Sequence, residues 1–489
     1  MKIKKYSPLL ILASVLASSN LVFAWSTDFM PSSIEEYNTE RKQLLNENSI
    51  TLSPKEEIVN QKLQNLKAEA QKNYNPSRPF YEHVNPKDDK AYKTDLFRFL
   101  LKMPKGANLH THSSSLLSVE GLFNLCERSN NICIYIYKNN KDIQFCELRV
   151  KGYDEITDGF LNFSDGAKLI GRENVINEWI NGEREEGRNP WEVFEENFSK
   201  IRKIFKSPEI FKGYYTLAFS EQAYDNTQRL EIRIVSSDAE GQNLKMFQEA
   251  YNYVKNNYHD EFTVKIIFSD TKTIAKKPLE RIDGLIDREI DLQNKFKDGQ
   301  NNLFIGIDLV GEEDAGQPLK DFAEHFIKAK NNGKKYDLYL HAGESVKPEN
   351  NSLADAYLLG SLRIGHGFNL YRFPEIAKKL IERNIVIEVC PISNQILGYA
   401  PDLSKHHARE YIKAGVPVVL ASDDPGMFYT KGLSYDFYVA VLAWDLNLAD
   451  IKQFCINSVN HSGGTGEERQ KLKALWQNKW DNFINEMSK

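Results

Sequence analysis

The chain has 489 residues, of which 41% are hydrophobic and 27% are charged, as in an ordinary globular protein with a large core. The formal net charge of −5 and an isoelectric point near 6.1 reflect a mixture of both signs, and no long basic run follows the extreme N-terminus. This charge distribution argues against nucleic acid as a partner.

The first 24 residues are typical of a secretory signal peptide. Residues 1–5 are basic, residues 9–17 are apolar, and Val22-Phe23-Ala24 has the small residues that a signal peptidase recognises. Polar residues 18–20 interrupt the apolar run before it reaches the roughly 18 residues that a membrane anchor needs. We expect cleavage near Ala24, a secreted or periplasmic protein and no membrane partner.

Residues 25–95 are predicted to form an N-terminal helical extension. Within residues 32–73, apolar residues recur at helical spacing, and Ser53, Pro54 and Glu56 are predicted as the N-cap, first residue and capping-box partner of the second of two helices. Two amphipathic helices are too small to form their own core, so they must pack on the main domain or on a second copy. A solvated charged arm is the alternative.

Residues 96–489 are predicted to form an α/β domain, a parallel (β/α)₈ barrel of the TIM type. Eight short apolar segments are each followed by a helical stretch, which is the pattern of this fold. The predicted strands are residues 107–112, 229–235, 264–268, 303–309, 337–341, 363–366, 385–389 and 416–421.

An insertion of about residues 116–227 follows the first strand. It is rich in glycine and asparagine, and it contains a predicted hairpin flanked by Cys133 and Cys146. One disulfide could close this hairpin in an exported protein.

Histidines and carboxylates stand at the ends of four predicted strands. All strand C-termini of a (β/α)₈ barrel meet at one mouth, so we expect these side chains to converge. They are His110 and His112 on one face of strand one, His341 and the nearby Glu344 after strand five, His366 after strand six, and Asp423 and Asp424 after strand eight.

Three imidazoles and one carboxylate suit a zinc ion that keeps one position open for water. Zinc lowers the pKa of such a water toward neutrality, which makes it a nucleophile for hydrolysis. Strand four ends in Asp308-Leu309-Val310-Gly311 and offers no lysine for a carbamate that would bridge two metals. We therefore expect one metal ion per chain.

The motifs at these strand ends resemble, in their order, those of the adenosine deaminase family. They are Met103-Pro104-Lys105-Gly106, His110-Thr111-His112, His341-Ala342-Gly343-Glu344, Arg363-Ile364-Gly365-His366-Gly367, Glu388-Val389-Cys390-Pro391-Ile392-Ser393-Asn394 and Ser422-Asp423-Asp424-Pro425. The signal peptide, the N-terminal helices and the insertion make the chain similar to the secreted branch, the adenosine deaminase-related growth factors.

This resemblance implies roles for individual residues. His110, His112, His341 and Asp423 would hold one zinc ion. Glu344 would protonate purine N1 while water attacks C6. His366 would hold the attacking water and stabilise its developing charge.

The resemblance also implies which residues bind the purine. Asp424 would bond the N7 edge, and the backbone N–H of Gly311 would reach N3. Trp191 falls where the secreted branch has an aromatic residue near the substrate, although a tryptophan that simply packs in the core is the alternative. Relatives usually have an aspartate just after the second zinc histidine to bind the ribose, whereas this chain has Ser113.

The implied activity is zinc-dependent hydrolytic deamination of adenosine, and of 2′-deoxyadenosine, to inosine and ammonia by a homodimer joined through its N-terminal helices. One alternative is a deaminase of AMP or free adenine, although no basic cluster adjoins the motifs to bind a phosphate. The other is a secreted growth-factor-like binding protein that keeps the barrel only as a scaffold.

Overall fold

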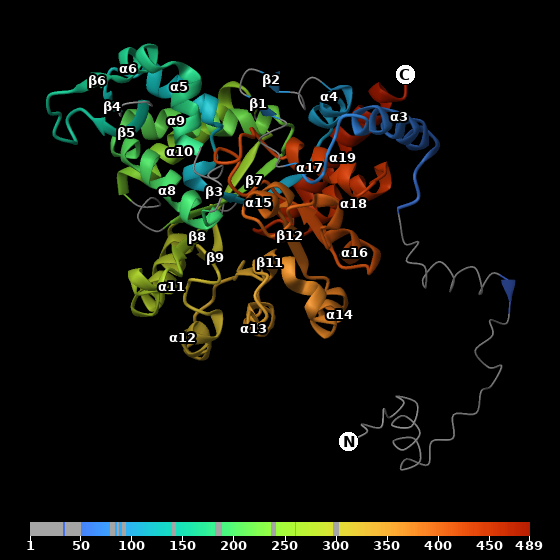
Figure 1. Cartoon of the computed structure of the whole chain (residues 1–489). Helices are drawn as coiled ribbons and strands as arrows, with labels where there is room; N and C mark the ends of the chain where they lie inside the picture. The colour runs from blue at the N-terminus through green and yellow to red at the C-terminus, as the bar shows by residue number, and fades with distance from the viewer. Residues whose placement is uncertain are drawn as a thin grey trace, which may run out of the picture. The chain divides into compact units, whose positions relative to one another are not determined.

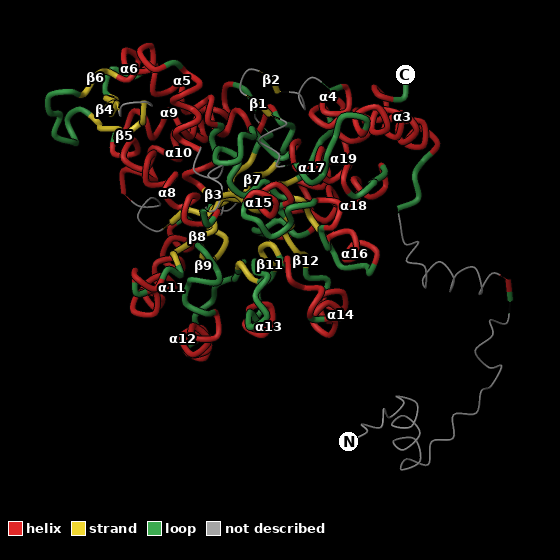
Figure 2. Tube along the Cα trace, viewed as in Figure 1, coloured by secondary structure: helices red, strands yellow, loops and turns green. Residues whose placement is uncertain are grey.

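Eight parallel strands form the centre of the part of the chain that the structure describes, and helices surround them (Figures 1 and 2). The computed structural model describes residues 33–34, 50–78, 84–85, 88–89, 94–138, 143–180, 188–235, 241–259, 261–296 and 303–489. The predicted signal peptide and nearly all of the first predicted N-terminal helix lie outside these ranges. Residues 49–489 form one compact unit that contains all eight strands.

The strands form two four-stranded sheets, each in sequential order. The first contains β3 (Ala107–His112), β7 (Arg229–Val235), β8 (Thr263–Thr271) and β9 (Phe304–Val310). The second contains β10 (His341–Ala342), β11 (Arg363–His366), β12 (Val386–Val389) and β13 (Val418–Leu420). Isolated parallel bridges from Ile307 to Leu338 and from Thr111 to Asp423 join the two sheets at both edges. The ring of strands confirms the predicted (β/α)₈ fold.

Helices follow the strands from β7 onward in chain order. They are α10 (Gly241–Asn257), α11 (Pro278–Lys295), α12 (Leu319–Asn331), α13 (Ser352–Leu359), α14 (Pro374–Arg383), α15 (Pro391–Ile396), α16 (Ala408–Lys413), α17 (Ser434–Ala443), α18 (Leu448–Asn460) and α19 (Gly466–Met487). Strand β7 shows how the layers are divided. Leu230, Ile232 and Ile234 belong to the main apolar core, whereas Glu231 and Arg233 alternate with them and point to the opposite face.

The fifth strand is shorter than predicted. Residues 337–341 were expected to pair throughout, but the structure has a single bridge at Leu338 and a two-residue strand that begins at His341. Hydrogen bonds from the Ile307 N–H to the Asp337 carbonyl and from the Tyr339 N–H to the Ile307 carbonyl hold this edge. His341 therefore stays at the same end of the barrel as the other strand-end residues.

The segment between β3 and β7 forms its own small layer. It contains α5 (Val119–Arg128), an antiparallel sheet of β4 (Ile132–Lys138), β5 (Ile143–Val150) and β6 (Phe160–Asn162), and then α6 (Phe163–Ile170), α7 (Arg172–Ile180), α8 (Pro190–Arg202) and α9 (Pro208–Tyr224). The predicted hairpin is present as β4 and β5. Its register places Cys133 opposite Arg149, and Cys133 is a free thiol in this structure. The side chain of Cys146, the other half of the possible disulfide, lies outside the described residues.

The described part of the N-terminal extension packs on the barrel. Helix α3 (Pro54–Gln71) contacts α4 (Asp95–Lys102), α17, α18 and α19. Its first turn has the predicted capping box of Ser53 and Glu56, and Val59 and Leu63 lie on its buried face. A two-residue pair of strands, β1 (Val84–Asn85) and β2 (Asp88–Asp89), precedes α4. Among the described residues, no helix is long and apolar enough to cross a membrane.

Candidate active site

Four strand ends bring histidines and a carboxylate into one cluster at the mouth of the barrel. The candidate ligand atoms of His110, His341, His366 and Asp423 all lie within 4.8 Å of one another, and all four residues are buried. They come from β3, β10, β11 and the residues after β13. Parallel strands place their C-terminal ends at one edge, which explains the convergence of residues that are far apart in sequence.

His112 lies beside this cluster and shares Asp423 with it. Its Nε2 atom is 3.1 Å from Asp423 Oδ1, and its ring centre is 5.3 Å from that of His110 and 5.2 Å from that of His341. His112, Asp423 and Asp424 form a second group with atoms within 4.8 Å of one another. Both histidines of the His-x-His motif thus reach the site, because alternate residues of a strand share a face.

Carboxylates behind the cluster orient two of the histidines. His110 Nδ1 is 2.8 Å from Glu388 Oε2, and His341 Nδ1 is 2.6 Å from Asp308 Oδ2. A carboxylate on one ring nitrogen leaves the other available as a metal ligand. The Nε2 atom of His110 is buried and has no hydrogen-bond partner among the described residues. Such a nitrogen, amid other imidazole and carboxylate donors, fits a zinc-like metal ion.

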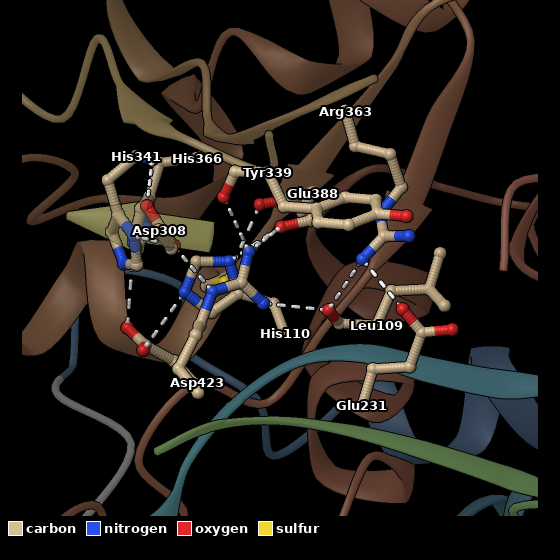
Figure 3. A network of polar contacts seen from close by, with 12 residues as sticks. Leu109, His110, Glu231, Asp308, Tyr339, His341, Arg363, His366, Glu388 and Asp423 are labelled. Carbon is tan, nitrogen blue, oxygen red and sulfur yellow. Dashed lines mark hydrogen bonds and ion pairs between the residues drawn. The ribbon is translucent and has the colours of Figure 1, made fainter. Parts of the chain in front are cut away.

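Two buried arginines, Arg233 and Arg363, neutralise these carboxylates. Figure 3 shows Arg363 between Glu388 and Glu231. Arg233 Nε lies 2.8 Å from Asp308 Oδ2, and Arg233 Nη2 lies 2.6 Å from Glu388 Oε2. Arg363 bridges Glu388 at 2.5 Å and Glu231 at 2.8 Å. All these side chains are at most 1% exposed, and a charge buried this deeply is tolerated only when it is paired. Glu231 and Arg233 were not predicted from the sequence. The feature that could have identified them is a pair of charged residues that alternate with apolar residues within a strand.

The pKa values of the two supporting carboxyls follow from this network. Burial by itself would raise the pKa of Asp308, but the nearby His341 and Arg233 lower it below its usual range. Burial also opposes ionisation of Glu388, but Arg233 and Arg363 hold its pKa well below normal. Both groups therefore remain anionic and keep accepting the N–H groups of the histidines.

Two site residues adopt a backbone conformation that is unusual for their type. His366 has φ 61° and Asp423 has φ 55°, both in the left-handed region. A residue with a side chain costs on the order of 1 kcal/mol there. The surrounding contacts must hold these conformations, which aim both side chains at the cluster. Backbone strain concentrated in this way is common at functional sites.

Glu344 lies next to the histidine cluster as a buried acid. It is 2% exposed, its Oε1 is 3.5 Å from His366 Nε2, and Oε1 has no hydrogen-bond partner among the described residues. Burial, followed by the neighbouring Asp423 and Glu313, raises the pKa of Glu344 well above its usual value. The group therefore holds a proton that it can donate.

Glu313 holds the turn that carries Glu344. Its carboxylate accepts the backbone N–H of Gly343 at 3.0 Å, that of Glu344 at 3.2 Å, and the Asn350 amide at 2.6 Å. Gly343 has φ +78°, and a Cβ atom there would lie 2.7 Å from Asn369 Oδ1, so this turn requires glycine. Glu313 was not predicted as a site residue, although it lies two residues after Gly311 beyond a predicted strand end.

Asp424 is a second buried acid beside the histidine cluster. It is 4% exposed, and its Oδ1 accepts the Ser115 hydroxyl. Burial and the adjacent Asp423 raise the pKa of Asp424 well above its usual value. A carboxyl that keeps its proton can donate a hydrogen bond to a ring nitrogen.

The remaining predicted residues lie at the rim. Gly311 directly follows β9 with φ +100°. Trp191 begins α8 and is 8% exposed, and its indole N–H donates to the Tyr399 hydroxyl at 2.6 Å. Burial raises the pKa of Tyr399, so its hydroxyl keeps its proton and can both accept and donate a hydrogen bond.

Comparison with known proteins agrees with this geometry. The sequence profile of the adenosine deaminase family matches residues 174–477. Adenosine deaminase 2 of Dictyostelium discoideum is 31% identical over 501 residues, covering 94% of this chain and 89% of the relative. Adenosine deaminase 2 of Homo sapiens is 29% identical over 518 residues, covering 95% of this chain and 96% of the relative.

Solved structures share the fold at low sequence identity. A zinc-bound amidohydrolase from Burkholderia ambifaria has a TM-score of 0.58 at 17% identity and covers 80% of this chain and 94% of its own. The ADAL protein of Arabidopsis, solved with GMP, has a TM-score of 0.57 at 19% identity and covers 78% of this chain and 98% of its own. By the family profile and by relatives that match it over nearly their whole length, the chain belongs to the adenosine deaminase family.

Proposed function

We propose that this protein catalyses the hydrolytic deamination of adenosine, and of 2′-deoxyadenosine, to inosine and ammonia. The observation that carries the proposal is the placement of a buried acid, Glu344, whose pKa is raised by burial, beside a cluster of four histidines and Asp423. Hydrolysis at a ring carbon needs an activated water and a proton donor on the same side of the substrate, and these residues supply both functions.

His110, His112, His341 and Asp423 would hold one zinc ion. Bound zinc would supply Lewis-acid activation of the attacking water. Glu388 and Asp308 fix the orientation of His110 and His341, so these rings need little rearrangement when the metal binds.

The protein's own side chains handle the protons. Glu344 donates its proton to purine N1, which makes C6 electrophilic, and the water oxygen bonds to C6. His366, whose Nε2 lies 3.5 Å from Glu344 and 3.8 Å from Asp423, holds the attacking water and stabilises its charge. One proton of the water passes to the amino group, which leaves as ammonia when the C6–N bond breaks. The other returns to Glu344, and the oxygen stays on C6 as the carbonyl of the hypoxanthine ring.

Three residues would orient the purine. Asp424 donates to N7, and the backbone N–H of Gly311 donates to N3, so the two edges of the ring are fixed from opposite sides. Trp191 offers an apolar surface near the ring, held by its bond to Tyr399. A purine that is fixed at both edges presents C6 to the water in one orientation.

A panel of substrates tests this proposal. Purified protein with zinc should convert adenosine and deoxyadenosine with the ultraviolet change from an adenine to a hypoxanthine chromophore. AMP and adenine should react at least about 100-fold more slowly, because phosphate lacks a partner and adenine lacks the ribose. Preferential turnover of AMP or adenine would support another substrate, and inosine binding without any turnover would support a binding protein.

Removal of the metal gives a separate prediction. Dialysis against a strong chelator should abolish turnover, and stoichiometric zinc should restore it, because the proposed mechanism relies on bound zinc to activate the attacking water. Metal analysis should find one zinc per chain in the active protein. Full activity in protein that contains no metal would contradict the role given to the histidines.

We also infer export and self-association. Residues 1–24 fit a cleaved signal peptide, which would make the mature enzyme secreted or periplasmic. The N-terminal helices would join two copies into a homodimer. N-terminal sequencing of protein from culture medium or periplasm should find a start near Trp25.

A further inference from the structure

Ser115 binds the acid that we propose to face purine N7. Its hydroxyl donates to Asp424 Oδ1, and the two residues are 1% and 4% exposed. Ser115 ends the short helical turn η3 (Ser113–Ser115) that directly follows the histidines of β3, whereas Asp424 follows β13. The contact therefore crosses between the first and the last strand of the barrel.

The backbone reinforces this contact. The Ser115 carbonyl accepts the N–H of Gly426 at 2.6 Å, and a Cβ atom at Gly426 would lie 2.8 Å from that same carbonyl oxygen. The turn after β3 and the turn after β13 thus approach as closely as glycine permits. Nearer the histidine cluster, the Asp423 N–H donates to the His110 carbonyl at 3.0 Å. The contacts of Ser115 therefore lie next to a backbone hydrogen bond that already joins the ends of β3 and β13.

A hydrogen bond to one carboxyl oxygen has a geometric consequence. The last torsion of an aspartate side chain is broad and roughly two-fold, so an unsupported carboxyl samples many orientations. Ser115 engages Oδ1 and thereby restricts the orientation of the whole Asp424 carboxyl. Recognition groups need such supporting contacts to hold them near productive geometry.

We propose that Ser115 is a positioning residue that orients the Asp424 carboxyl for hydrogen bonding to N7 of the purine. This inference rests on the proposed function for the identity of the ligand, and it adds a residue that lies outside the strand-end motifs. Ser115 acts through Asp424 and does not touch the reacting atoms. Its loss should weaken only those ligands that offer N7.

The test compares inosine with 7-deazainosine, in which a C–H group replaces N7. Calorimetric binding to the zinc-loaded protein does not require turnover. Ser115→Ala should raise the Kd of inosine by about 5- to 30-fold and change the Kd of 7-deazainosine by less than about 2-fold. Ser114→Ala is the matched control and should change neither value. Ser114 lies in the same turn, and both serines line a small cavity together with Leu117, Val119 and Met427.

Further variants separate positioning from a merely structural role. On an Asp424→Asn background, Ser115→Ala should have no additional effect on inosine binding, because the two residues act as one unit. If Ser115→Ala does not fold, Ser115→Cys can replace it in the test. Its thiol is similar in size to the hydroxyl but only a weak hydrogen-bond donor, so inosine should again lose affinity and 7-deazainosine should not.

Two outcomes would overturn the inference. One is an equal loss of affinity for both ligands, which would mean that Ser115 only supports the fold. The other is unchanged inosine affinity. A wild-type protein that binds inosine but does not deaminate adenosine would instead contradict the proposed function and leave the role of Ser115 intact.

Discussion

The residues at the barrel mouth depend on partners one layer behind them. His110 and His341 each present one ring nitrogen inward because Glu388 and Asp308 engage the other. Glu344 keeps its place because Glu313 accepts the backbone N–H groups of its turn. A buried carboxyl therefore fixes each of these three side chains, His110, His341 and Glu344.

Glu344→Gln should lower kcat by about 10² to 10⁴ while zinc stays bound, because glutamine preserves the shape but has no proton to give to N1. The measurement is initial rate alongside metal content. Asp423→Ala is the companion variant and should lose both metal and rate. Retention of more than about a tenth of the wild-type rate by Glu344→Gln would show that another group is the acid.

Ser113→Asp should lower KM for adenosine by about 5- to 30-fold and leave kcat nearly unchanged. Ser113 directly follows His112 and is 3% exposed, at the position where relatives are expected to bind the ribose with a carboxylate. A charge-assisted hydrogen bond to a sugar hydroxyl is about twice as strong as a neutral one.

Steady-state kinetics with adenosine and with a sugar-modified analogue would check this expectation, with Ser114→Asp as the control. If the ratio of the two KM values does not move, Ser113 does not face the ribose.

At the scale of elements, α3 shows how an amphipathic helix is fixed to the barrel. Glu56 closes the capping box through the Ser53 N–H at 2.8 Å, and it also accepts the Trp480 indole at 2.8 Å and pairs with Lys452 at 2.6 Å. The same carboxylate thus caps the N-terminus of α3 and connects this helix to α18 and α19. Burial alone would raise the pKa of Glu56, but these partners together lower it from 4.5 to about 2.

Glu56→Gln should therefore reduce the free energy of unfolding at pH 7 by about 1–3 kcal/mol, after allowance for solvent screening. A carboxylate whose pKa is lower in the folded state stabilises the protein above its unfolded pKa and loses this contribution as pH falls through the folded value. The difference between wild type and variant should shrink as pH falls from about 5 toward 2.

Urea unfolding at several pH values would measure this difference. Glu57→Gln, one residue along and exposed, is the control and should show no such dependence. A difference that is independent of pH would assign the role of Glu56 to packing alone.

At the scale of the whole molecule, the N-terminal helices are the predicted interface between two copies of the chain. The apolar face of α3, with Val59 and Leu63 fully buried, already packs against its own chain. A homodimer built through this region must therefore use other faces or residues before 49. The deaminase barrel does not need the partner to complete its strands or its cluster.

The processed chain has a mass somewhat below the 56.3 kDa of the full sequence. Light scattering at micromolar concentration should give about twice the mass of that processed chain. Deletion of residues 25–48 should shift the mass to that of a monomer and leave kcat unchanged, since the site lies within one chain. A monomeric mass for the undeleted protein would contradict the dimer.

The sequence by itself determined the order of the eight strands, because each strand and helix has a local periodicity and a local end. The rule that parallel strands share one mouth is then sufficient to bring His110, His112, His341, His366, Asp423 and Asp424 together. The capping box at Ser53 and Glu56 is equally local, and it too was predicted correctly.

Only the tertiary structure decided which side chains meet across the barrel. The pairing of Arg233 with Glu388 and of Ser115 with Asp424 depends on the register of the strands that carry or precede these residues. Register is set by packing between elements that are distant in sequence, and a slip of one residue would send every side chain to the other face. Local patterns therefore predict which residues reach the site, whereas non-local packing decides what holds them there.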